Sequence, residues 1–377
     1  MSILVALDSF KGSMSSLEAA QAVKNGIIKA YGSKEEVTII PVADGGEGTL
    51  EALTYGKRVA QHKVEVTGPL GDAVEATYMV VDGHIAIMEM AQAAGLTLVP
   101  LEKRNPLYTT TYGVGEMIAH GLSVGCDKFL LGIGGSATND CGVGMLQALG
   151  FQMLDNGLKN VKFGAKGLKE IVEINKDKVI SKVFDSEFII ACDVDNPLLG
   201  DRGCSNIFAP QKGATPEMVA AMEEGIKHFV KVVGDDDLHC TPGAGAAGGL
   251  GYAFLQFLDG KLMSGADMVI KETCLEKYIK TTDIIIVGEG KMDAQTTMGK
   301  IPFAIAKLAK KYNKKVVAVA GLVEDKDILM NAGAFDYIIS VDNRGMTLED
   351  AMKKENAMHN LEKTIDIALR GLRTTNE

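Results

Sequence analysis

The 377-residue sequence predicts an α/β protein in which the two ends of the chain form a doubly wound parallel sheet around a large mixed α/β insertion. Near both ends, short apolar runs alternate with segments of helical periodicity, which is typical of parallel strands covered by helices on both faces. The middle contains a hairpin signal and a less regular alternation. At ~150 residues per domain, the length suggests two domains or three.

The N-terminal segment predicts strand, helix and strand. Ser2–Leu7 is an apolar run that suits a buried parallel strand. Ser15 and Glu18 have the spacing of a capping box, in which each side chain satisfies a free amide at the start of a helix. Apolar residues then recur at helical spacing until Gly32, and residues 37–42 form the next expected strand.

The C-terminal segment repeats this alternation. Apolar runs predict strands at residues 283–287, 315–320 and 337–341. The expected helices are residues 302–312, a short one near Ile328 and a long charged one at the end of the chain. Together with the two N-terminal strands, these would make one parallel sheet.

The middle of the chain predicts a separate mixed domain. Residues 74–81 and 84–89 flank Asp82-Gly83, a strong hairpin signal. Further strands are expected at 128–133 and 188–192, with helices near 113–121, 143–149, 218–233 and 246–258. We therefore expect residues 1–66 plus 281–377 to form the sheet domain and residues 67–280 to form the insertion.

Composition restricts the class of function. The formal charge is −10, from 39 Lys and Arg against 49 Asp and Glu, which argues against nucleic-acid and anionic membrane partners. No run of ~18 apolar residues suggests a membrane span, and no basic leader suggests secretion. The 6 cysteines show no CxxC spacing, so we expect reduced thiols, no structural zinc and a cytoplasmic enzyme.

Polar, glycine-rich segments follow the predicted strands, where open α/β sheets bind ligands. Residues 8–13, DSFKGS, follow the first strand and contain Lys11, which could equally be a solvated lysine in an ordinary loop. After the second strand, Asp44, Gly45, Gly46 and Glu47 combine flexible backbone with two carboxylates suited to Mg²⁺ or hydrogen bonds.

A third segment, residues 132–142, joins a strand to a helix and predicts a cradle for a phosphate or a carboxylate. Amides at a helix N-terminus attract anions, and hydroxyl and amide side chains can donate further bonds. Ordinary N-capping by two of its members is the alternative. The candidate residues are Gly134, Gly135, Ser136, Thr138, Asn139 and Asp140.

Two further segments place charged residues after apolar strands. Asp193 ends one strand, and by itself it could be either a turn residue or a functional carboxylate. Residues 288–300 again combine glycines, carboxylates and a lysine. Their candidates are Gly288, Gly290 and Lys300 for phosphate binding, with Glu289 and Asp293 for metal.

Neither of two common nucleotide-binding motifs is supported by the sequence. Residues 243–248 match GxGxxG, but no strand precedes them, so a helix start that permits close packing is favoured over NAD binding. Gly299-Lys300 is followed by Ile301, so the P-loop pattern GxxxxGK[ST] is absent, as is the protein-kinase set of motifs.

Taken together, these segments resemble the bacterial glycerate kinase family, whose members convert D-glycerate to 2-phosphoglycerate. The resemblance spans nearly the whole chain. It rests on DSFKGS at 8–13, PVADGGEGT at 41–49, TGPLG at 67–71, EKRNP at 102–106, GIGGSATND at 132–140, CDVDNPL at 192–198, FAPQKGA at 208–214, PGAGAAGGLG at 242–251 and GEGKMDAQT at 288–296. Cys141, Asp195 and Lys291 depart from the residues usual there.

The resemblance implies a Rossmann-like, flavodoxin-like domain split by the insertion, with the active site in the cleft between the two domains. It also implies an ATP-dependent phosphotransferase with an alcohol group as acceptor, assisted by Mg²⁺. A kinase for another small hydroxy acid and a non-catalytic sensor of phosphorylated metabolites are the alternatives. The partners would be small molecules, and the oligomeric state stays open between monomer and homodimer.

The chemistry of phosphoryl transfer assigns expected roles to these residues. Arg104 and Lys11 are candidates to clamp the glycerate carboxylate or the γ-phosphate. Asp193, partly by the resemblance, is the candidate base for the acceptor hydroxyl. The candidates for Mg²⁺, directly or through water, are Asp44, Glu47, Glu289 and Asp293.

Overall fold

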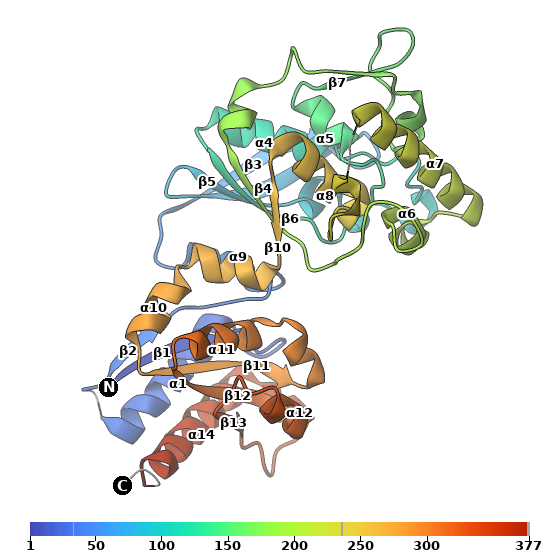
Figure 1. Cartoon of the computed structure of the whole chain (residues 1–377). Helices are drawn as coiled ribbons and strands as arrows, with labels where there is room; N and C mark the ends of the chain where they lie inside the picture. The colour runs from blue at the N-terminus through green and yellow to red at the C-terminus, as the bar shows by residue number, and fades with distance from the viewer. Residues whose placement is uncertain (33, 235–236, 375–377) are drawn as a thin grey trace. The chain divides into compact units, whose positions relative to one another are not determined.

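The computed structural model describes residues 1–32, 34–234 and 237–374, and the chain divides into two compact units (Figure 1). Unit 1 comprises Met1–Gly56 and Ser264–Glu377, and unit 2 comprises Lys57–Met263. A discontinuous domain interrupted by an insertion is therefore present. The breaks precede the expected ones at 66/67 and 280/281, because a strand and two helices that the sequence analysis did not identify lie there.

Unit 1 contains a fully parallel five-stranded sheet, which confirms the doubly wound prediction. The strands are β1 (Ser2–Leu7), β2 (Glu36–Ile39), β11 (Ile284–Met292), β12 (Lys315–Val323) and β13 (Tyr337–Ser340). Their order across the sheet is β13-β12-β11-β1-β2, the flavodoxin-like arrangement. The strand order reverses between β1 and β11, and such a switch point is where α/β sheets bind ligands.

Helices cover both faces of this sheet (Figure 1). Right-handed crossovers that run in opposite directions from the switch point place α1 and α11 on opposite faces. The capping box of Ser15 and Glu18 starts α1, as predicted, and α1 packs along α14. The helices of unit 1 are α1 (Ser16–Tyr31), α2 (Thr49–Thr54), α9 (Gly265–Glu272), α10 (Leu275–Thr281), α11 (Ile301–Lys311), α12 (Lys326–Asn331), α13 (Leu348–Met352) and α14 (Lys354–Thr374).

Unit 2 contains a mixed six-stranded sheet in the order β10-β9-β6-β5-β4-β3. Its strands are β3 (Val59–Thr67), β4 (Ala73–Val81), β5 (Ile85–Glu89), β6 (Lys128–Gly132), β9 (Glu187–Ala191) and β10 (Lys261–Met263). β3, β4 and β5 are antiparallel, and β5, β6, β9 and β10 are parallel. The predicted hairpin is confirmed, with positive φ at both Asp82 and Gly83.

Helices and a two-stranded ribbon surround the core of unit 2. The helices are α3 (Ala91–Ala94), α4 (Tyr112–Ser123), α5 (Val143–Ala148), α6 (Cys204–Phe208), α7 (Pro216–Val233) and α8 (Ala246–Leu258), and the ribbon pairs β7 (Gln152–Leu154) with β8 (Glu173–Asn175). Stacked and edge-on aromatic pairs, such as Phe129 with Phe188, fill the core beneath the sheet. Within the described part of the chain, no helix is both long and apolar enough to cross a membrane.

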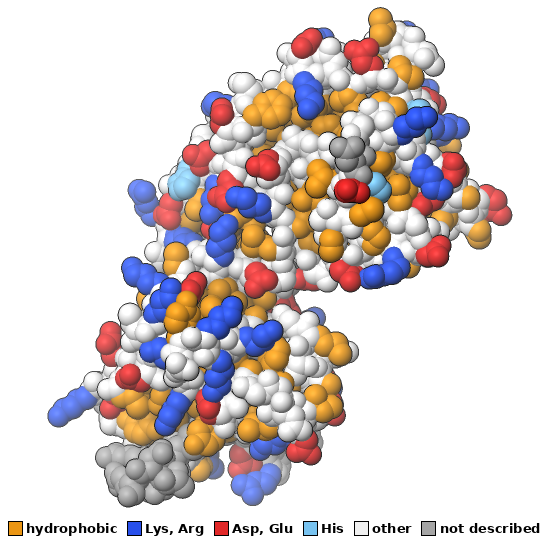
Figure 2. Space-filling model, viewed as in Figure 1, with side chains coloured by type: hydrophobic (Ala, Val, Ile, Leu, Met, Phe, Trp, Pro, Cys, Tyr) orange, Lys and Arg blue, Asp and Glu red, His pale blue; other side chains and the backbone are white. Residues whose placement is uncertain are grey.

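The surface drawn in Figure 2 carries charges of both signs. Lys and Arg side chains are interspersed with Asp and Glu over each unit, and hydrophobic side chains gather in small groups.

Candidate functional site

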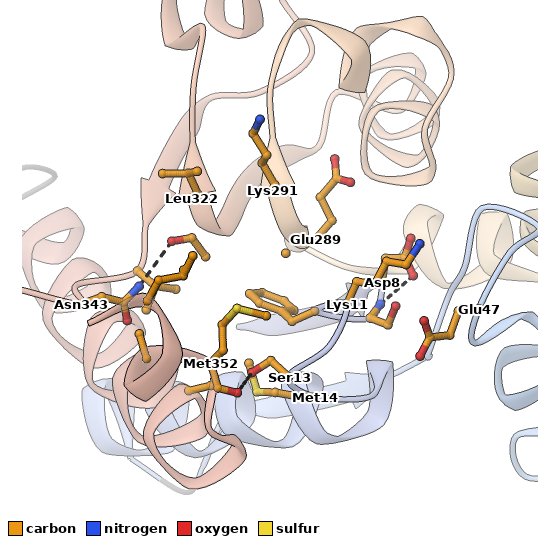
Figure 3. Close-up of a pocket in the computed structure, with 18 of the residues that line it drawn as sticks. Asp8, Lys11, Ser13, Met14, Glu47, Glu289, Lys291, Leu322, Asn343 and Met352 are labelled. Carbon is orange, nitrogen blue, oxygen red and sulfur yellow. Dashed lines mark hydrogen bonds between the residues drawn. The ribbon is translucent and has the colours of Figure 1, made fainter. Parts of the chain in front are cut away.

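A cavity of about 560 Å³ lies at the carboxyl ends of the unit 1 strands (Figure 3). Its lining includes one residue after or at the end of each strand: Asp8, Asp44, Glu289, Gly321 and Val341. The volume is in the range of small-molecule sites, and the position is the one that strand order predicts for a ligand.

The loop after β1 contacts the end of β11 at this cavity. A Cβ atom on Gly290 would lie 3.3 Å from both the Lys11 amide nitrogen and the Phe10 Cα, so glycine permits this close approach. Ser13 Oγ donates to the Met352 carbonyl at 2.8 Å, which fixes the other end of the loop. The exposed Lys11 side chain is thus carried by a loop that is held at both ends, and it lies at the cavity with Asp8 (Figure 3).

Asp8 is a functional candidate that the sequence analysis did not select. Its side chain is buried, and its Oδ1 accepts a hydrogen bond from the Ser9 amide at 2.6 Å. Burial, with smaller contributions from the negative charges of Asp44 and Glu289, raises the pKa of Asp8 to about 7. Its position directly after a buried strand, as the first residue of DSFKGS, is the sequence feature that could have identified Asp8 as a candidate.

Glu289 is engaged by neighbouring side chains. Its Oε2 lies 2.9 Å from Lys300 Nζ, and its Oε1 accepts from Thr296 Oγ1 at 2.8 Å. Burial raises the pKa of Glu289, partly offset by the Lys300 and Thr296 hydrogen bonds. Lys291, which is exposed, lies 2.8 Å from Glu324 and 3.4 Å from Asp293.

Three unit 1 candidates do not line the cavity. Gly288 is buried in β11, where a Cβ would lie 2.0 Å from the Val319 carbonyl oxygen, so glycine is needed there for strand packing. Asp293 caps the 3₁₀ turn Ala294–Met298 by accepting from the Gln295 amide. Gly45 has a φ of 105° and packs against Gly265 at the start of α9.

The predicted metal ligands do not form a ready-made cage. Asp44 and Glu47 line the cavity with Asp8 and Glu289, and Asp293 lies outside its lining. In the described part of the chain, no group of three or more His, Cys, Asp or Glu side chains is arranged to hold a metal ion. An ion at this position would therefore need oxygen ligands from water or a bound molecule as well.

In unit 2, strand register brings the other two candidate segments to one edge of the sheet. Gly132 lies beside Ala191 in the parallel pairing of β6 and β9. The segment of Gly134 and Gly135 and the segment of Asp193 therefore both extend from the carboxyl ends of neighbouring strands. All three residues are exposed.

Asp140 has a structural role in unit 2. It is buried, and its Oδ2 accepts from the Thr111 amide and hydroxyl, both at 2.9 Å. Its two oxygens also accept from the Gly142 and Gly144 amides at the start of α5. The capping alternative is thus correct for Asp140, whose carboxylate already accepts from the amides at the start of α5. An anion bound by this segment would have to contact Gly134, Gly135 and Ser136 instead.

A buried lysine lies beneath the remaining part of that segment. Lys212 is 2% exposed, and its Nζ donates to Ser136 Oγ and to the Thr138 carbonyl, both at 2.7 Å. Burial lowers the pKa of Lys212 to about 8. Among the described residues, no carboxylate pairs with it, and the buried Thr138 Oγ1 and Asn139 Oδ1 have no hydrogen-bond partner.

This arrangement leaves donors available at the exposed end of the segment. A lysine ammonium can only donate, so Ser136 Oγ is the acceptor in their bond and its own proton is available to another acceptor. Sequence analysis missed Lys212, although it stands inside the FAPQKGA motif at 208–214. Arg104 lies close to the residue after Lys212, because a Cβ on Gly213 would be 2.3 Å from the Arg104 carbonyl oxygen. The half-buried side chain of Arg104 donates from Nε to the Val99 carbonyl.

The glycine-rich segment at 242–251 packs against both of these unit 2 segments. A Cβ on Gly245 would lie 2.2 Å from the Pro197 carbonyl oxygen, and one on Gly248 would lie 2.1 Å from that of Thr138. The GxGxxG match therefore reflects close packing, as the missing strand before it indicates, and it helps to fix the backbone that carries Asp193 and Ser136.

Comparison with known proteins identifies the family. Residues 3–372 match the model of the glycerate kinase family. The chain belongs to this family. It is 44% identical over 362 residues to "Glycerate kinase" of Haemophilus influenzae (94% of each chain covered), and 40% identical over 379 residues to "Glycerate 2-kinase" of Escherichia coli (98% of this chain and 99% of the relative).

A solved structure agrees with this assignment. A crystal structure from Salmonella typhimurium LT2, described as "putative glycerate kinase 2", superimposes with a TM-score of 0.87 at 39% identity, and the match covers 100% of this chain and 99% of that one. The resemblance inferred from the motifs is therefore confirmed, as is the split α/β architecture. The family places the chain among phosphotransferases that use an alcohol group as acceptor.

Proposed function

We propose that the protein transfers the γ-phosphoryl group of ATP to D-glycerate and forms 2-phosphoglycerate. The observation that carries this proposal is the unit 1 cavity at the switch point, where three lysines and several carboxylates surround a space of nucleotide size. The relatives named glycerate kinase and glycerate 2-kinase support the choice of acceptor and product.

The polyphosphate of ATP would bind at the charged end of this cavity. Phosphoryl transfer needs positive charge against negative charge spread over the transferred group, together with accurate positioning. Lys11 and Lys300 supply that charge, and the backbone at Gly46 and Gly290 can approach phosphate oxygens because no side chain intervenes. Lys300 is held in place by its ion pair with Glu289.

The carboxylates of the cavity fit Mg²⁺ carried by the nucleotide. Magnesium usually retains water and takes one or two carboxylates besides the substrate phosphates, so the absence of a cage among the described residues is compatible with it. Asp8 and Asp44 would hold the ion, with Glu47 acting through water, while Glu289 is already bonded to Lys300. The bound ion would supply charge neutralisation to the phosphates. A nearby cation would also favour the ionised form of the buried Asp8.

The acceptor would be bound by the unit 2 segments. The carboxylate of glycerate would accept hydrogen bonds from the exposed backbone of Gly134 and Gly135 and from the Ser136 hydroxyl, with Lys212 providing positive charge beneath them. Arg104 would add a second cation. Asp193, exposed at the end of β9, would accept the proton of the attacking hydroxyl.

An acceptor panel tests the proposal directly. ADP formation would be followed with Mg-ATP and D-glycerate, L-glycerate, glycolate, lactate or glycerol, and ³¹P and ¹H NMR would locate the phosphate on the product. We expect turnover with D-glycerate and phosphorylation at O2. Absence of ATP consumption with D-glycerate would refute the proposal, and turnover only with another hydroxy acid would reassign the acceptor.

All six cysteines are free thiols, which supports the proposed cytoplasmic location.

A further inference from the structure

The unit 1 cavity has a second, apolar compartment that the proposed phosphate and metal contacts do not use. Its walls are the side chains of Phe10, Met14, Leu322, Val341, Leu348 and Met352. Figure 3 shows Leu322, Asn343 and Met352 on the side of the cavity away from Asp8 and Glu47. The cavity therefore has a charged end and an apolar end.

Two leucines of this compartment are exposed, whereas Phe10, Met14 and Val341 are buried. Leu348 is 77% exposed and Leu322 is 48% exposed, although both line the cavity. Apolar surface left in water costs about 25 cal/mol per Å², so covering these side chains with an apolar ring would be favourable. Grouped apolar exposure inside a concave site is a recognised mark of ligand binding.

One polar side chain in this compartment has a fixed orientation. Asn343 Oδ1 accepts from Asn360 Nδ2 at 3.0 Å, and Asn343 Nδ2 donates to the Gly321 carbonyl at 3.4 Å. Because the oxygen is held by the buried Asn360, the amide cannot rotate freely and keeps its nitrogen toward β12. The second hydrogen of Nδ2 has no partner among the described residues, so it can donate to a ring nitrogen.

The end of β12 adds backbone groups to the same wall. The last residue pair between β12 and β13 is Ala320 with Ser340, and β12 continues to Val323. On the β13 side, Gly321 and Leu322 therefore extend beyond the neighbouring strand and line the cavity. A planar heterocycle with both donors and acceptors on its edge suits an apolar slot with an oriented amide and a strand that extends beyond its neighbour.

We propose that this compartment binds the adenine base of the nucleotide. The assignment rests on the proposed kinase function. Ser13 Oγ donates to the Met352 carbonyl and so joins the apolar wall to the loop that carries Lys11. A nucleotide with its base among Leu322, Leu348 and Asn343 would extend its phosphates toward the lysines of the same cavity. The two ends thus match the two chemically different ends of ATP.

The test compares ATP with inorganic tripolyphosphate, which has the charges but no base. Mg²⁺-dependent binding of both would be measured by calorimetry for the wild type and for Leu322→Ser/Leu348→Ser. Both leucines are exposed, so the fold is expected to survive, and circular dichroism would verify it. We expect the Kd for ATP to rise about tenfold or more, and the Kd for tripolyphosphate to change less than about twofold.

A matched variant controls for loss of surface apolar groups. Ile328 is 51% exposed and Ile367 is 58% exposed, both in unit 1 and outside the cavity lining. Ile328→Ser/Ile367→Ser should leave both Kd values unchanged. The base assignment is overturned if the leucine variant weakens ATP and tripolyphosphate equally, or weakens neither. If the wild-type protein binds ATP but phosphorylates no acceptor, the proposed function is refuted. The assignment of the base to this compartment would still be decided by the two Kd values.

Discussion

Both units have glycine-rich segments after parallel strands, but their lysines differ in burial and in pairing with carboxylates. In unit 1, Lys291 and Lys300 are partly exposed and are paired with carboxylates. In unit 2, Lys212 is 2% exposed and pairs with no carboxylate of the described chain. Exposed, paired lysines can exchange partners when a polyanion arrives. A buried lysine has a fixed position, and its field is weakly screened.

For the carboxylates the contrast in burial is reversed. Asp8 in unit 1 is buried among like charges, whereas Asp193 in unit 2 is exposed at the end of its strand. A buried carboxyl that is costly to ionise suits a group that meets a cation, and an exposed one suits a group that must reach a substrate hydroxyl. This difference supports the proposed assignment of the nucleotide to unit 1 and of the acceptor to unit 2.

The largest effect is expected from the carboxylates, and Asp8→Asn tests unit 1. We expect kcat to fall at least a hundredfold, since an amide is a poor substitute for a carboxylate beside Mg²⁺. The melting temperature of the unliganded protein should rise by several degrees, because a buried charge near Asp44 and Glu289 is removed. Calorimetry and a coupled ADP assay measure both. The exposed Asp327→Asn is the control, and an Asp8 variant with normal kcat would exclude the metal role.

Asp193→Asn tests unit 2 in the same way. Loss of a general base typically lowers turnover by 10² to 10⁴, so we expect at least about a hundredfold lower kcat with unchanged thermal stability. Asp195, two residues on, is exposed and paired with Arg202 at 2.6 Å, which makes Asp195→Asn a matched control with near-normal kcat. Steady-state kinetics that show equal losses in both variants would argue for a loop effect instead of a base.

Lys212→Met tests whether the buried cation serves substrate or only structure. We expect kcat/KM for glycerate to fall roughly 10- to 100-fold, the scale of a hydrogen bond to a charged group, with little change in KM for ATP. The exposed Lys231→Met on α7 should have no effect. An equal change in both KM values would favour a purely structural role.

The pH dependence of the wild type sharpens this test. Because burial lowers the pKa of Lys212 to about 8, the ammonium is present below that pH and is lost above it. Cys204 and Asp140 are the titratable groups that face it. The kcat/KM for glycerate should therefore decline above about pH 8 in the wild type, and the decline should be absent in Lys212→Met. If kcat/KM for glycerate still declines above about pH 8 in Lys212→Met, the decline belongs to another titratable group.

Lys11→Ala should have an intermediate effect, confined to the nucleotide. The side chain is exposed and its loop is fixed by Ser13, so the substitution would remove the proposed phosphate contact without loss of packing. We expect an increase in KM for ATP on the order of tenfold and no change in KM for glycerate. Lys326→Ala, also exposed and in unit 1, is the control. A change in KM for glycerate alone would move Lys11 from the nucleotide to the acceptor.

The strands of unit 1 could be predicted because they are apolar on both faces, as in Ser2–Leu7, and because the capping box at Ser15 marks its helix. β3 escaped prediction because most of Val59–Thr67 is exposed and polar, so its pairing with β4 leaves little apolar signal. That one strand accounts for the first shifted boundary. α9 and α10, short helices that pack on α11, account for the second.

In the candidate site, the sequence alone does not distinguish residues that can contact a ligand from residues that only pack. Gly288 and Gly290 stand in one GEG motif, yet one faces the Val319 carbonyl in the sheet and the other faces the loop of Lys11. Only tertiary packing separates these roles. Lys212 likewise depends on Ser136, far away in the sequence, for the contact that makes it a buried cation. Motif order identified the family, whereas burial decides which members of a motif are available to a ligand.

The smallest effect is expected at Lys291, where the resemblance described in the sequence analysis would predict arginine. The side chain is exposed and already contacts Glu324 and Asp293, so solvent and these partners screen its charge. Lys291→Arg should keep the charge and both partners, and should change KM for ATP by less than about threefold. A larger gain in affinity, measured by calorimetry with ATP and tripolyphosphate, would show a bidentate phosphate contact that lysine cannot make. Exposed charges would then matter as much in unit 1 as the buried one does in unit 2.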